Sequence, residues 1–318
     1  MPSKVVAGVT VVSTPGLTIT EYHGGASTND SNLSAVHEVI TSTTPTLNPW
    51  RCPEFTEYIL MIEGEAHIEH NNNNNTNSDD KTPASTDDND ATTTTELIIV
   101  PAGSSIYLPA GCRVRVNYPS TAELIAICLP AYSPDTEHPE PTTTTTTTPA
   151  HATNTIPTLH KSIPVVIAPT LTITEYIGSV ASSHPTISAC LAHVNTSTSD
   201  AWQSPIFREW VLVLHGTLHL QHGNDDGMTT IVPAGSGVTL EEGERVKWVW
   251  PDEGGCVYVP ICVPAFSPEG CRREEEVGSA KDEDPGTMVG LKELHATATA
   301  TATGTATGTD ADGGKSNA

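Results

Sequence analysis

The chain has 318 residues, with 14 Lys and Arg against 38 Asp and Glu, which gives a formal net charge of −24 at pH 7. This balance argues against nucleic acid and anionic membrane surfaces as partners, because neither would find a basic patch on the protein. The length suffices for two ordinary domains, and a hydrophobic content of 36% is low enough to predict that part of the chain is not packed.

Seven cysteines are scattered along the chain, and none forms a CxxC pair. An odd number of scattered thiols is typical of a reduced, intracellular protein rather than of a disulfide scaffold. Residues 1–17 contain one lysine and a short apolar run broken by threonine, which makes a poor signal peptide. No apolar stretch is long enough to span a bilayer. We therefore expect a cytoplasmic protein by default, with plastid and nucleus left open.

An internal repeat organises the sequence into four blocks that recur in the same order. The hexapeptide LTITEY occurs at residues 17–22 and again at 171–176. The longer blocks match residues 50–70 to 202–222, residues 100–116 to 232–248, and residues 128–134 to 262–268. Matches in a fixed order predict a duplicated domain.

Within each copy, short aromatic and aliphatic runs are separated by Pro and Gly, which is typical of strands and turns. Few segments have a helical period. The clearest expected strands are residues 57–62, 97–100 and 113–116 in the first copy and residues 209–214 and 245–250 in the second. Many short strands with regular turns predict an all-β fold of barrel or jelly-roll type.

Three segments outside the repeat have polar or low-complexity compositions that cannot bury enough apolar surface to offset the entropy of ordering. They divide the chain into domains and connections. The expected organisation is an N-terminal barrel at residues 1–137 with a disordered loop insertion at 71–95, a Thr/Pro-rich linker at 138–158, a C-terminal barrel at 159–277, and a disordered tail at 278–318.

The motifs resemble those of the cupin superfamily, and two copies in one chain resemble a bicupin. The first cupin motif is a glutamate, six residues and a glycine, as from Glu57 to Gly64 and from Glu209 to Gly216. The second motif is a glycine, five residues, a proline, one residue and a glycine. Its matches are Gly103, Pro109 and Gly111 in the first copy and Gly235 and Gly243 in the second, where Glu241 replaces the proline. The resemblance covers residues 15–137 and 170–275 and implies two cupin-type double-stranded β-helix (jelly-roll) barrels in tandem.

The same resemblance implies a metal site of three histidines and a glutamate, from which this sequence departs. The histidine positions fall on Trp50, Cys52 and Val114 in copy one and on Trp202, Ser204 and Val246 in copy two. Only Glu57 and Glu209 remain of the usual ligands, with Cys52 as a soft substitute. Because a divalent transition metal usually needs three or four ligands, no cofactor is predicted, although the sequence leaves a divalent metal open.

Strand alternation predicts which side chains face the interior of the second barrel. If Val246 points inward, Trp248 and Trp250 do as well. With Glu209 also pointing inward, copy two would have an aromatic bowl with one carboxylate, lined by Trp202, Ser204, Glu209, Val246 and Trp248. The expected ligand-binding residues are Trp202, Ser204, Glu209, Val246 and Trp248 in copy two and Trp50, Cys52 and Glu57 in copy one. Copy one is expected to be more filled than hollow. The alternative is that the tryptophans fill the barrel as ordinary core residues.

Histidines and cysteines outside these motifs have plainer explanations. His67, His70, His219 and His222 are expected at the surface near turns. A relocated metal site built from His215, His219 and His193 is the alternative. Cys128 and Cys262 are expected to be small buried hydrophobes, because no His/Asp partner supports a nucleophilic role.

Three classes of function follow from the sequence. The preferred class is a metal-independent bicupin that binds a small organic molecule. The second is a cupin-type enzyme of the isomerase, lyase, decarboxylase or dioxygenase class, with Glu57 or Glu209 as the catalytic acid or base, or with a relocated metal site. The third is a structural or storage-type bicupin. A homodimer formed through barrel edges is a further expectation, whereas no nucleic-acid or membrane partner is expected.

Overall fold

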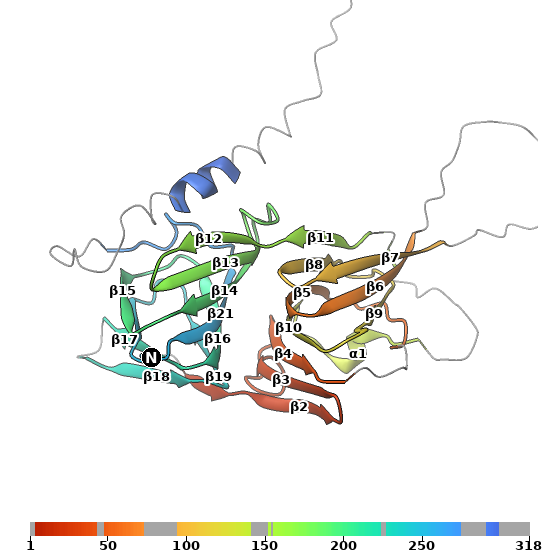
Figure 1. Cartoon of the computed structure of the whole chain (residues 1–318), viewed down its shortest axis with the longest axis horizontal. Coiled ribbons are helices and arrows are strands. Elements are labelled where there is room, and N and C mark those ends of the chain that lie inside the picture. Colours follow the sequence, from red (N-terminus) through yellow and green to blue (C-terminus); the bar gives the residue numbers. More distant parts are fainter. Residues whose placement is uncertain are drawn as a thin grey trace, which may run out of the picture. The chain divides into compact units, whose positions relative to one another are not determined.

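The structure, a computed structural model, describes residues 4–42, 48–72, 94–140, 152–153, 155–223, 227–274 and 291–298. The chain divides into two compact units, which are traced in Figure 1. We call the unit of residues 9–159 barrel one, and the unit of residues 1–8 and 160–318 barrel two. Nearly all regular structure in the described residues is β-strand, which confirms the predicted all-β fold.

Barrel one consists of a larger and a smaller sheet. Its strands are β2 (Val9–Thr14), β3 (Leu17–His23), β4 (Ser34–Ile40), β5 (Thr56–Glu63), β6 (Glu65–Asn72), β7 (Thr94–Pro101), β8 (Ser104–Leu108), β9 (Val114–Asn117), β10 (Ala122–Leu129) and β11 (Thr158–Lys161). The larger sheet has seven strands in the order β11-β8-β5-β10-β4-β3-β2, and the smaller has three in the order β7-β6-β9. A short helix, α1 (Pro134–Glu137), follows β10.

Barrel two repeats this plan. Its strands are β1 (Val5–Ala7), β12 (Ile163–Ile167), β13 (Leu171–Ile177), β14 (Ser188–Val194), β15 (Thr198–Gln203), β16 (Arg208–His215), β17 (Thr217–His222), β18 (Thr229–Pro233), β19 (Ser236–Leu240), β20 (Val246–Trp250) and β21 (Cys256–Val263). One sheet has seven strands in the order β1-β19-β16-β21-β14-β13-β12, and the other has four in the order β15-β20-β17-β18.

The glycine of the first cupin motif has a steric role in both barrels. Gly64 and Gly216 end β5 and β16 with φ values of +74° and +73°. A Cβ at these positions would lie 2.3 Å from the Thr121 carbonyl oxygen and 2.2 Å from the Gly255 carbonyl oxygen, respectively. Only glycine allows the close approach of the two backbones at this turn.

The repeated LTITEY segment also has a structural explanation. The carboxylate of Glu21 accepts backbone hydrogen bonds from Ala26 and Ser27, at 2.8 and 2.7 Å. The carboxylate of Glu175 accepts the corresponding bonds from Val180 and Ala181, at 2.7 and 2.8 Å. Each glutamate therefore satisfies the backbone of the loop that follows its strand, which is why a buried acid recurs at this place.

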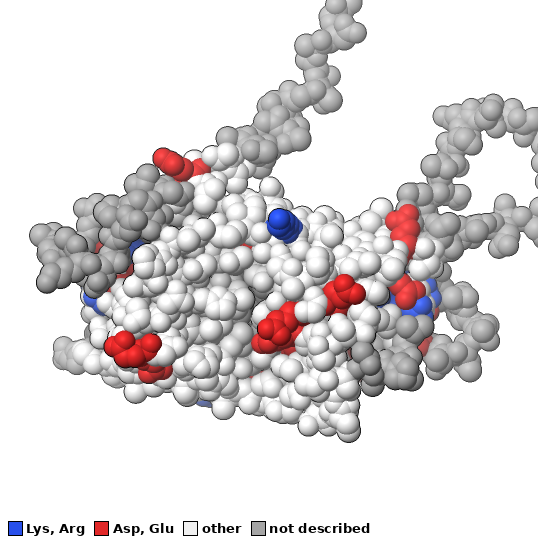
Figure 2. All heavy atoms as spheres, in the orientation of Figure 1, with Lys and Arg blue, Asp and Glu red and all other residues white. Residues whose placement is uncertain are grey.

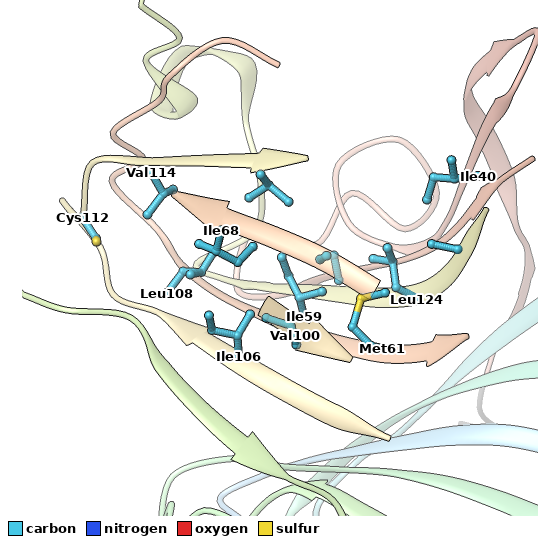
Figure 3. Close-up of a cluster of buried hydrophobic side chains, with 14 residues drawn as sticks. Ile40, Ile59, Met61, Ile68, Val100, Ile106, Leu108, Cys112, Val114 and Leu124 are labelled. Atoms are coloured by element: carbon cyan, nitrogen blue, oxygen red, sulfur yellow. The ribbon is translucent and has the colours of Figure 1, made fainter. Parts of the chain in front are cut away.

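The two barrels differ in the composition of their cores. In barrel one, aliphatic side chains fill the space between the sheets, with Ile59 and Met61 on β5 facing Ile68 and Val100 (Figure 3). In barrel two, the corresponding cluster contains Trp248, Trp250 and Tyr258, whose ring centroids lie 5.5 to 6.1 Å apart. These tryptophans point into the barrel, as the alternation predicts.

The boundaries of the units differ from the expected domains at four places. Strand β1 lies at the edge of the larger sheet of barrel two, where Val6 pairs with Gly237, although the sequence predicts that the N-terminal barrel begins at residue 1. The expected insertion at 71–95 is shorter, because its ends belong to β6 and β7. The expected linker at 138–158 contributes its last residue to β11. The expected tail at 278–318 contains a helix at residues 291–298. The remaining parts of these three segments lie largely outside the described residues.

Candidate functional site

A polar row crosses three neighbouring strands inside each barrel. In barrel one, Cys128 on β10 lies between Ser34 on β4 and Glu57 on β5. In barrel two, Cys262 on β21 lies between Ser188 on β14 and Glu209 on β16. Both cysteines are therefore neighbours of the motif glutamate, which their interpretation as plain buried hydrophobes did not anticipate. Burial beside that carboxylate raises the pKa of each thiol well above its usual range, so neither is a reactive thiolate.

Barrel two contains a cavity of about 110 Å³ around its polar row. Its polar lining comes mainly from Glu209, Gln203, Asp200 and Glu175, and its aromatic wall includes Trp248, Trp250 and Tyr258. Gln203 and Asp200 both reach the cavity because the pairing of β15 with β20 is irregular between Ser199 and Trp202. The cavity thus combines a few convergent polar groups with apolar walls, which is the usual composition of a small-molecule site.

The carboxyl of Glu209 is buried in this cavity, and its pKa is strongly shifted. Burial is the main cause that raises its pKa to about 8; a hydrogen bond with Cys262 opposes the shift, and the charge of Asp200 adds to it. The other two acids have partners of their own, because Asp200 pairs with Arg273 and Glu175 binds backbone amides. At neutral pH, Glu209 is therefore mostly protonated and can donate a hydrogen bond into the cavity.

Two residues of the cavity wall also carry buried hydrogen-bond donors. The indole N–H groups of Trp248 and Trp250 are enclosed, and among the described residues neither finds an acceptor. Both side chains are 3% exposed. A buried N–H without an acceptor costs about 1–3 kcal/mol, and a bound molecule that supplies an oxygen would recover that cost.

Barrel one has an ion pair at the corresponding place. Arg51 donates a hydrogen bond of 2.5 Å to Glu57, and both side chains are mostly buried. Burial and the charge of Glu57 raise the pKa of Glu38 on β4 to about 7, while Arg51 opposes the shift. Burial alone would lower the pKa of Arg51, but the charge of Glu57 and their hydrogen bond raise it above its usual range. Inside barrel one, the positive charge of Arg51 therefore compensates the negative charge of Glu57.

The matched sequence blocks show how this difference arises. Arg51 of copy one corresponds to Gln203 of copy two, and Glu137 corresponds to Cys271. Arg51 and Glu137 lie 4.0 Å apart as a charged pair, whereas the Cys271 thiol donates a hydrogen bond of 2.7 Å to the side-chain amide oxygen (Oε1) of Gln203. A neutral pair in barrel two thus replaces a charged pair in barrel one.

Trp50 and Trp202 lie apart from these interior groups. The Arg113 and Arg115 guanidinium carbons lie 4.1 and 4.9 Å from the Trp50 ring centroid, and the Arg245 guanidinium carbon lies 4.1 Å from that of Trp202. Trp202 lines a separate surface hollow of about 380 Å³ together with Arg245. The residue beside each tryptophan, Arg51 or Gln203, is the one that reaches the interior. The inward-facing residue therefore lies one position after the expected Trp50 or Trp202. A shift of one residue along a strand exchanges its two faces.

The other expected ligand-binding residues are dispersed. Val246 is fully buried in the main core of barrel two, and Ser204 is half-buried and does not line the cavity. Cys52 is fully buried, and its thiol donates a hydrogen bond of 3.3 Å to the Gly111 carbonyl oxygen. Of the five residues expected in copy two, the structure brings Glu209 and Trp248 together at the cavity.

Two histidines expected at the surface are buried. His70 is fully buried, with Nε2 3.6 Å from Glu96. His222 is 6% exposed, with Nδ1 3.1 Å from Glu244 and Nε2 2.8 Å from the Thr230 hydroxyl. Their place on the interior face of β6 and β17 explains the error, because the alternation along these strands continues to the last residues.

The donor groups do not fit the metal that the cupin fold implies. Glu57 is engaged with Arg51, and Glu209 is surrounded by a thiol, an amide and aromatic rings. Across the described part of the chain, no three His, Cys, Asp or Glu side chains are arranged to hold a metal ion, and this includes His193, His215 and His219. A guanidinium beside the carboxylate repels a cation, so barrel one is the less suitable of the two.

Several residues of the site carry too weak a sequence signal to be found in advance. Arg51 and Gln203 stand between the two positions of the His-x-His motif, and only the strand register shows that they point inward. Asp200 reaches the cavity through an irregular pairing. The pairing of Cys128 and Cys262 with the glutamates could have been inferred from the repeat, since both cysteines recur at one place.

Comparison with solved structures supports the cupin-type fold. The chain is similar to oxalate decarboxylase of Bacillus subtilis, with a TM-score of 0.58 and 12% identity over 83% of this chain and 78% of that chain in a study of its Mn(II) centres. The structure of the same enzyme at pH 4.6 gives a TM-score of 0.54 and 13% identity over 84% and 77% of the two chains. At this identity the likeness shows the fold alone: two cupin barrels in tandem.

Sequence comparisons add little to this result. No family model matches the chain. A stretch of 97 residues is 31% identical to endoribonuclease YbeY of Myxococcus xanthus, and it spans 30% of this chain and 32% of that protein. The chain thus spans about a third of this relative's length, which does not show a family. Among the described residues, no helix is both long and apolar enough to cross a membrane.

Proposed function

We propose that this protein is a small-molecule-binding bicupin and that barrel two holds the ligand without a metal ion. The observation that carries the proposal is the pair of buried indole N–H groups at the wall of a cavity that also contains Glu209. Protonated Glu209 and the two indoles offer three hydrogen-bond donors at neutral pH. A ligand with carbonyl or hydroxyl oxygens would satisfy them.

The charges around the cavity restrict the ligand further. Its described lining contains carboxyl groups but no Lys or Arg, and burial lowers the pKa of the lining His295, which keeps its ring neutral. An anion would be buried without a facing cation, which is costly. Acidic groups also dominate the charge visible on the face in Figure 2. We therefore infer a neutral or cationic ligand, so oxalate, after which the structurally similar Bacillus subtilis decarboxylase is named, is not the molecule that this cavity favours.

The size of the cavity sets an upper limit on the ligand. Its volume of about 110 Å³ is below that of an engineered apolar cavity, about 150 Å³, that binds benzene. The ligand, or the part of it that enters the barrel, therefore has on the order of six heavy atoms.

The proposal is tested by calorimetric titration of the full chain with three molecules of one shape. Isobutyramide, isobutyramidinium and isobutyrate have the same heavy-atom frame and carry charges of 0, +1 and −1. We expect the neutral molecule or the cation to bind and the anion to fail. Preferential binding of isobutyrate would contradict the proposal, as would the absence of any hit from a wider library of neutral and cationic fragments.

A single substitution serves as the control. Gln203→Arg places the guanidinium of barrel one into barrel two, where it would pair with Glu209 and fill the cavity. We expect this variant to fold and to lose binding. The same substitution should leave barrel one unchanged, so retained binding in a folded Gln203→Arg variant would place the ligand elsewhere.

A second candidate function is catalysis by the same cavity. A carboxyl group with a pKa near 8 is suited to general acid–base chemistry at neutral pH, and Glu209 has that property. If the cavity is catalytic, the rate at which it converts its substrate should depend on the ionisation of Glu209. A rate profile that Glu209→Gln leaves unchanged between about pH 6 and pH 9 would exclude it.

A further inference from the structure

The helix at residues 291–298 packs onto the cavity of barrel two. Leu291 and His295 lie one helical turn apart on the same face, and they are 5% and 6% exposed. Both side chains line the cavity together with Val165, Val166 and Phe266. A segment remote in sequence from the cupin motifs therefore supplies part of the cavity wall.

The attachment of this helix to the barrel is small. Leu291 joins Val165 and Val166 in a cluster of three buried residues, whereas the main core of barrel two contains fourteen. Most other residues of the helix are exposed, including Leu294 at 37%. An eight-residue helix is not stable alone in water, so its structure depends on this contact. Segments with few buried apolar contacts open at low free-energy cost.

The helix also brings a polar side chain to the ligand site. The His295 ring lies edge-on to Phe266, with a centroid distance of 5.6 Å. Burial lowers the pKa of His295 in spite of the charge of Glu269, so a neutral imidazole faces the cavity at neutral pH. Neutral imidazole can both donate and accept a hydrogen bond, which makes it a useful contact for a small polar ligand.

Barrel one is covered differently at the corresponding end. Tyr132, which corresponds to Phe266, packs against Phe55 with a centroid distance of 5.7 Å. Its hydroxyl donates a hydrogen bond of 2.9 Å to Glu137 of α1, which lies 4.0 Å from Arg51. Within the described parts of the chain, the residues next to β10 thus cover the charged interior of barrel one.

We propose that the helix at residues 291–298 is a removable cover of the barrel-two cavity, that it opens to admit the ligand, and that it contributes Leu291 and His295 to the bound state. This inference rests on the proposed function, because it concerns access to the same cavity, but it does not depend on the identity of the ligand. Opening exposes the floor of the cavity, which includes the Cys262 and Cys271 thiols.

The experiment measures the labelling rates of individual cysteines in the full chain, with methyl methanethiosulfonate as the reagent and peptide mass spectrometry as the readout. Leu291→Asp disrupts the buried contact, and Leu294→Asp introduces the same charge on the exposed side of the same helix. We expect Leu291→Asp to label Cys262 and Cys271 roughly 10- to 100-fold faster, because it removes the burial of one leucine side chain from the closed state. Leu294→Asp should label them at the native rate.

Two other cysteines distinguish opening of the cover from loosening of the fold. Cys256 is buried in the core of barrel two but does not line the cavity, and Cys128 holds the place of Cys262 in barrel one. Both should keep their native rates in every variant. Equal labelling of Cys262 in the native chain and in Leu291→Asp would overturn the proposal, as would an acceleration that Cys256 shares. If Leu291→Asp opens the cover and ligand binding is unchanged, the helix does not contribute to the bound state, whereas the proposed function of barrel two still holds. The inference and the proposed function can therefore fail separately.

Discussion

The two barrels are built from one repeated sequence, yet corresponding positions inside them carry opposite chemistry. Barrel one places Arg51, Glu57 and Glu38 around its polar row, and Arg51 pairs with Glu57. Barrel two has Gln203, Glu209 and Ala192 at these positions, with tryptophans on the neighbouring β20. The motif glutamate therefore has no fixed role: its neighbours decide whether it is an ionised partner of arginine or a protonated donor beside a cavity.

The largest expected effect is on the stability of barrel one. Glu57→Gln removes the carboxylate that faces Arg51 and leaves a buried guanidinium with weaker partners. We expect a loss of about 3 kcal/mol in the free energy of unfolding, the lower end for a broken buried ion pair, because Glu38 and Glu137 still face Arg51. Urea unfolding at pH 7 measures it. A change below about 1 kcal/mol, the value for an exposed pair, would contradict the ion-pair interpretation.

The corresponding substitution in barrel two, Glu209→Gln, should increase the free energy of unfolding. Burial raises the pKa of Glu209 from 4.5 to about 8, so the unfolded chain ionises this group first, and stability falls as pH rises between these values. Glu209→Gln removes this loss and should stabilise the protein at pH 7, by at most about 3 kcal/mol.

The pH dependence provides the check on that prediction. Below pH 4.5, where the group is protonated in both states, native protein and Glu209→Gln should have nearly equal stability; the difference should grow up to about pH 8. Thermal or urea unfolding at several pH values measures this difference. A Glu209→Gln variant that is less stable than the native protein at pH 7 would show that the carboxylate is ionised and paired.

A smaller effect is expected on ligand affinity. Trp248→Phe removes one buried indole N–H while keeping an aromatic wall, so a ligand oxygen loses one donor. We expect binding to weaken roughly fivefold, since a hydrogen bond is worth about 1 kcal/mol and about 1.4 kcal/mol is a factor of ten. Calorimetric titration with the ligand found above measures it, with Val246→Ala as a control that alters the core near the cavity without touching a donor.

The smallest effect is expected at Trp202. Its ring stacks on Arg245, which also pairs with Glu274 at 2.6 Å, and both charged side chains are partly exposed. Such contacts contribute about 1 kcal/mol or less. Trp202→Leu should therefore change stability slightly and leave ligand affinity unchanged. A loss of affinity equal to that of Trp248→Phe would show that Trp202 contributes to the binding site.

The sequence predicts much of the fold, and less of the site. The internal repeat and the regular spacing of Pro and Gly are sufficient to predict two all-β barrels. The alternation of charged and apolar residues at 245–250 places Trp248 and Trp250 inside. The orientation of Trp202 cannot be read in this way, because a shift of one residue along a strand exchanges its faces and the motif spacing allows either choice. The covering helix lies in a polar tail, and only its packing on Val165 and Val166 shows why it is ordered.

Binding of a small molecule among the tryptophans of barrel two is tested most directly by the indole N–H signals. The chain has five tryptophans: Trp50, Trp202, Trp210, Trp248 and Trp250. In a chain labelled with ¹⁵N at tryptophan, neutral and cationic fragments should shift the indole signals of Trp248 and Trp250 and leave those of Trp50 and Trp202 in place. Bound fragments that leave Trp248 and Trp250 unshifted, or that shift Trp202 instead, would contradict the account.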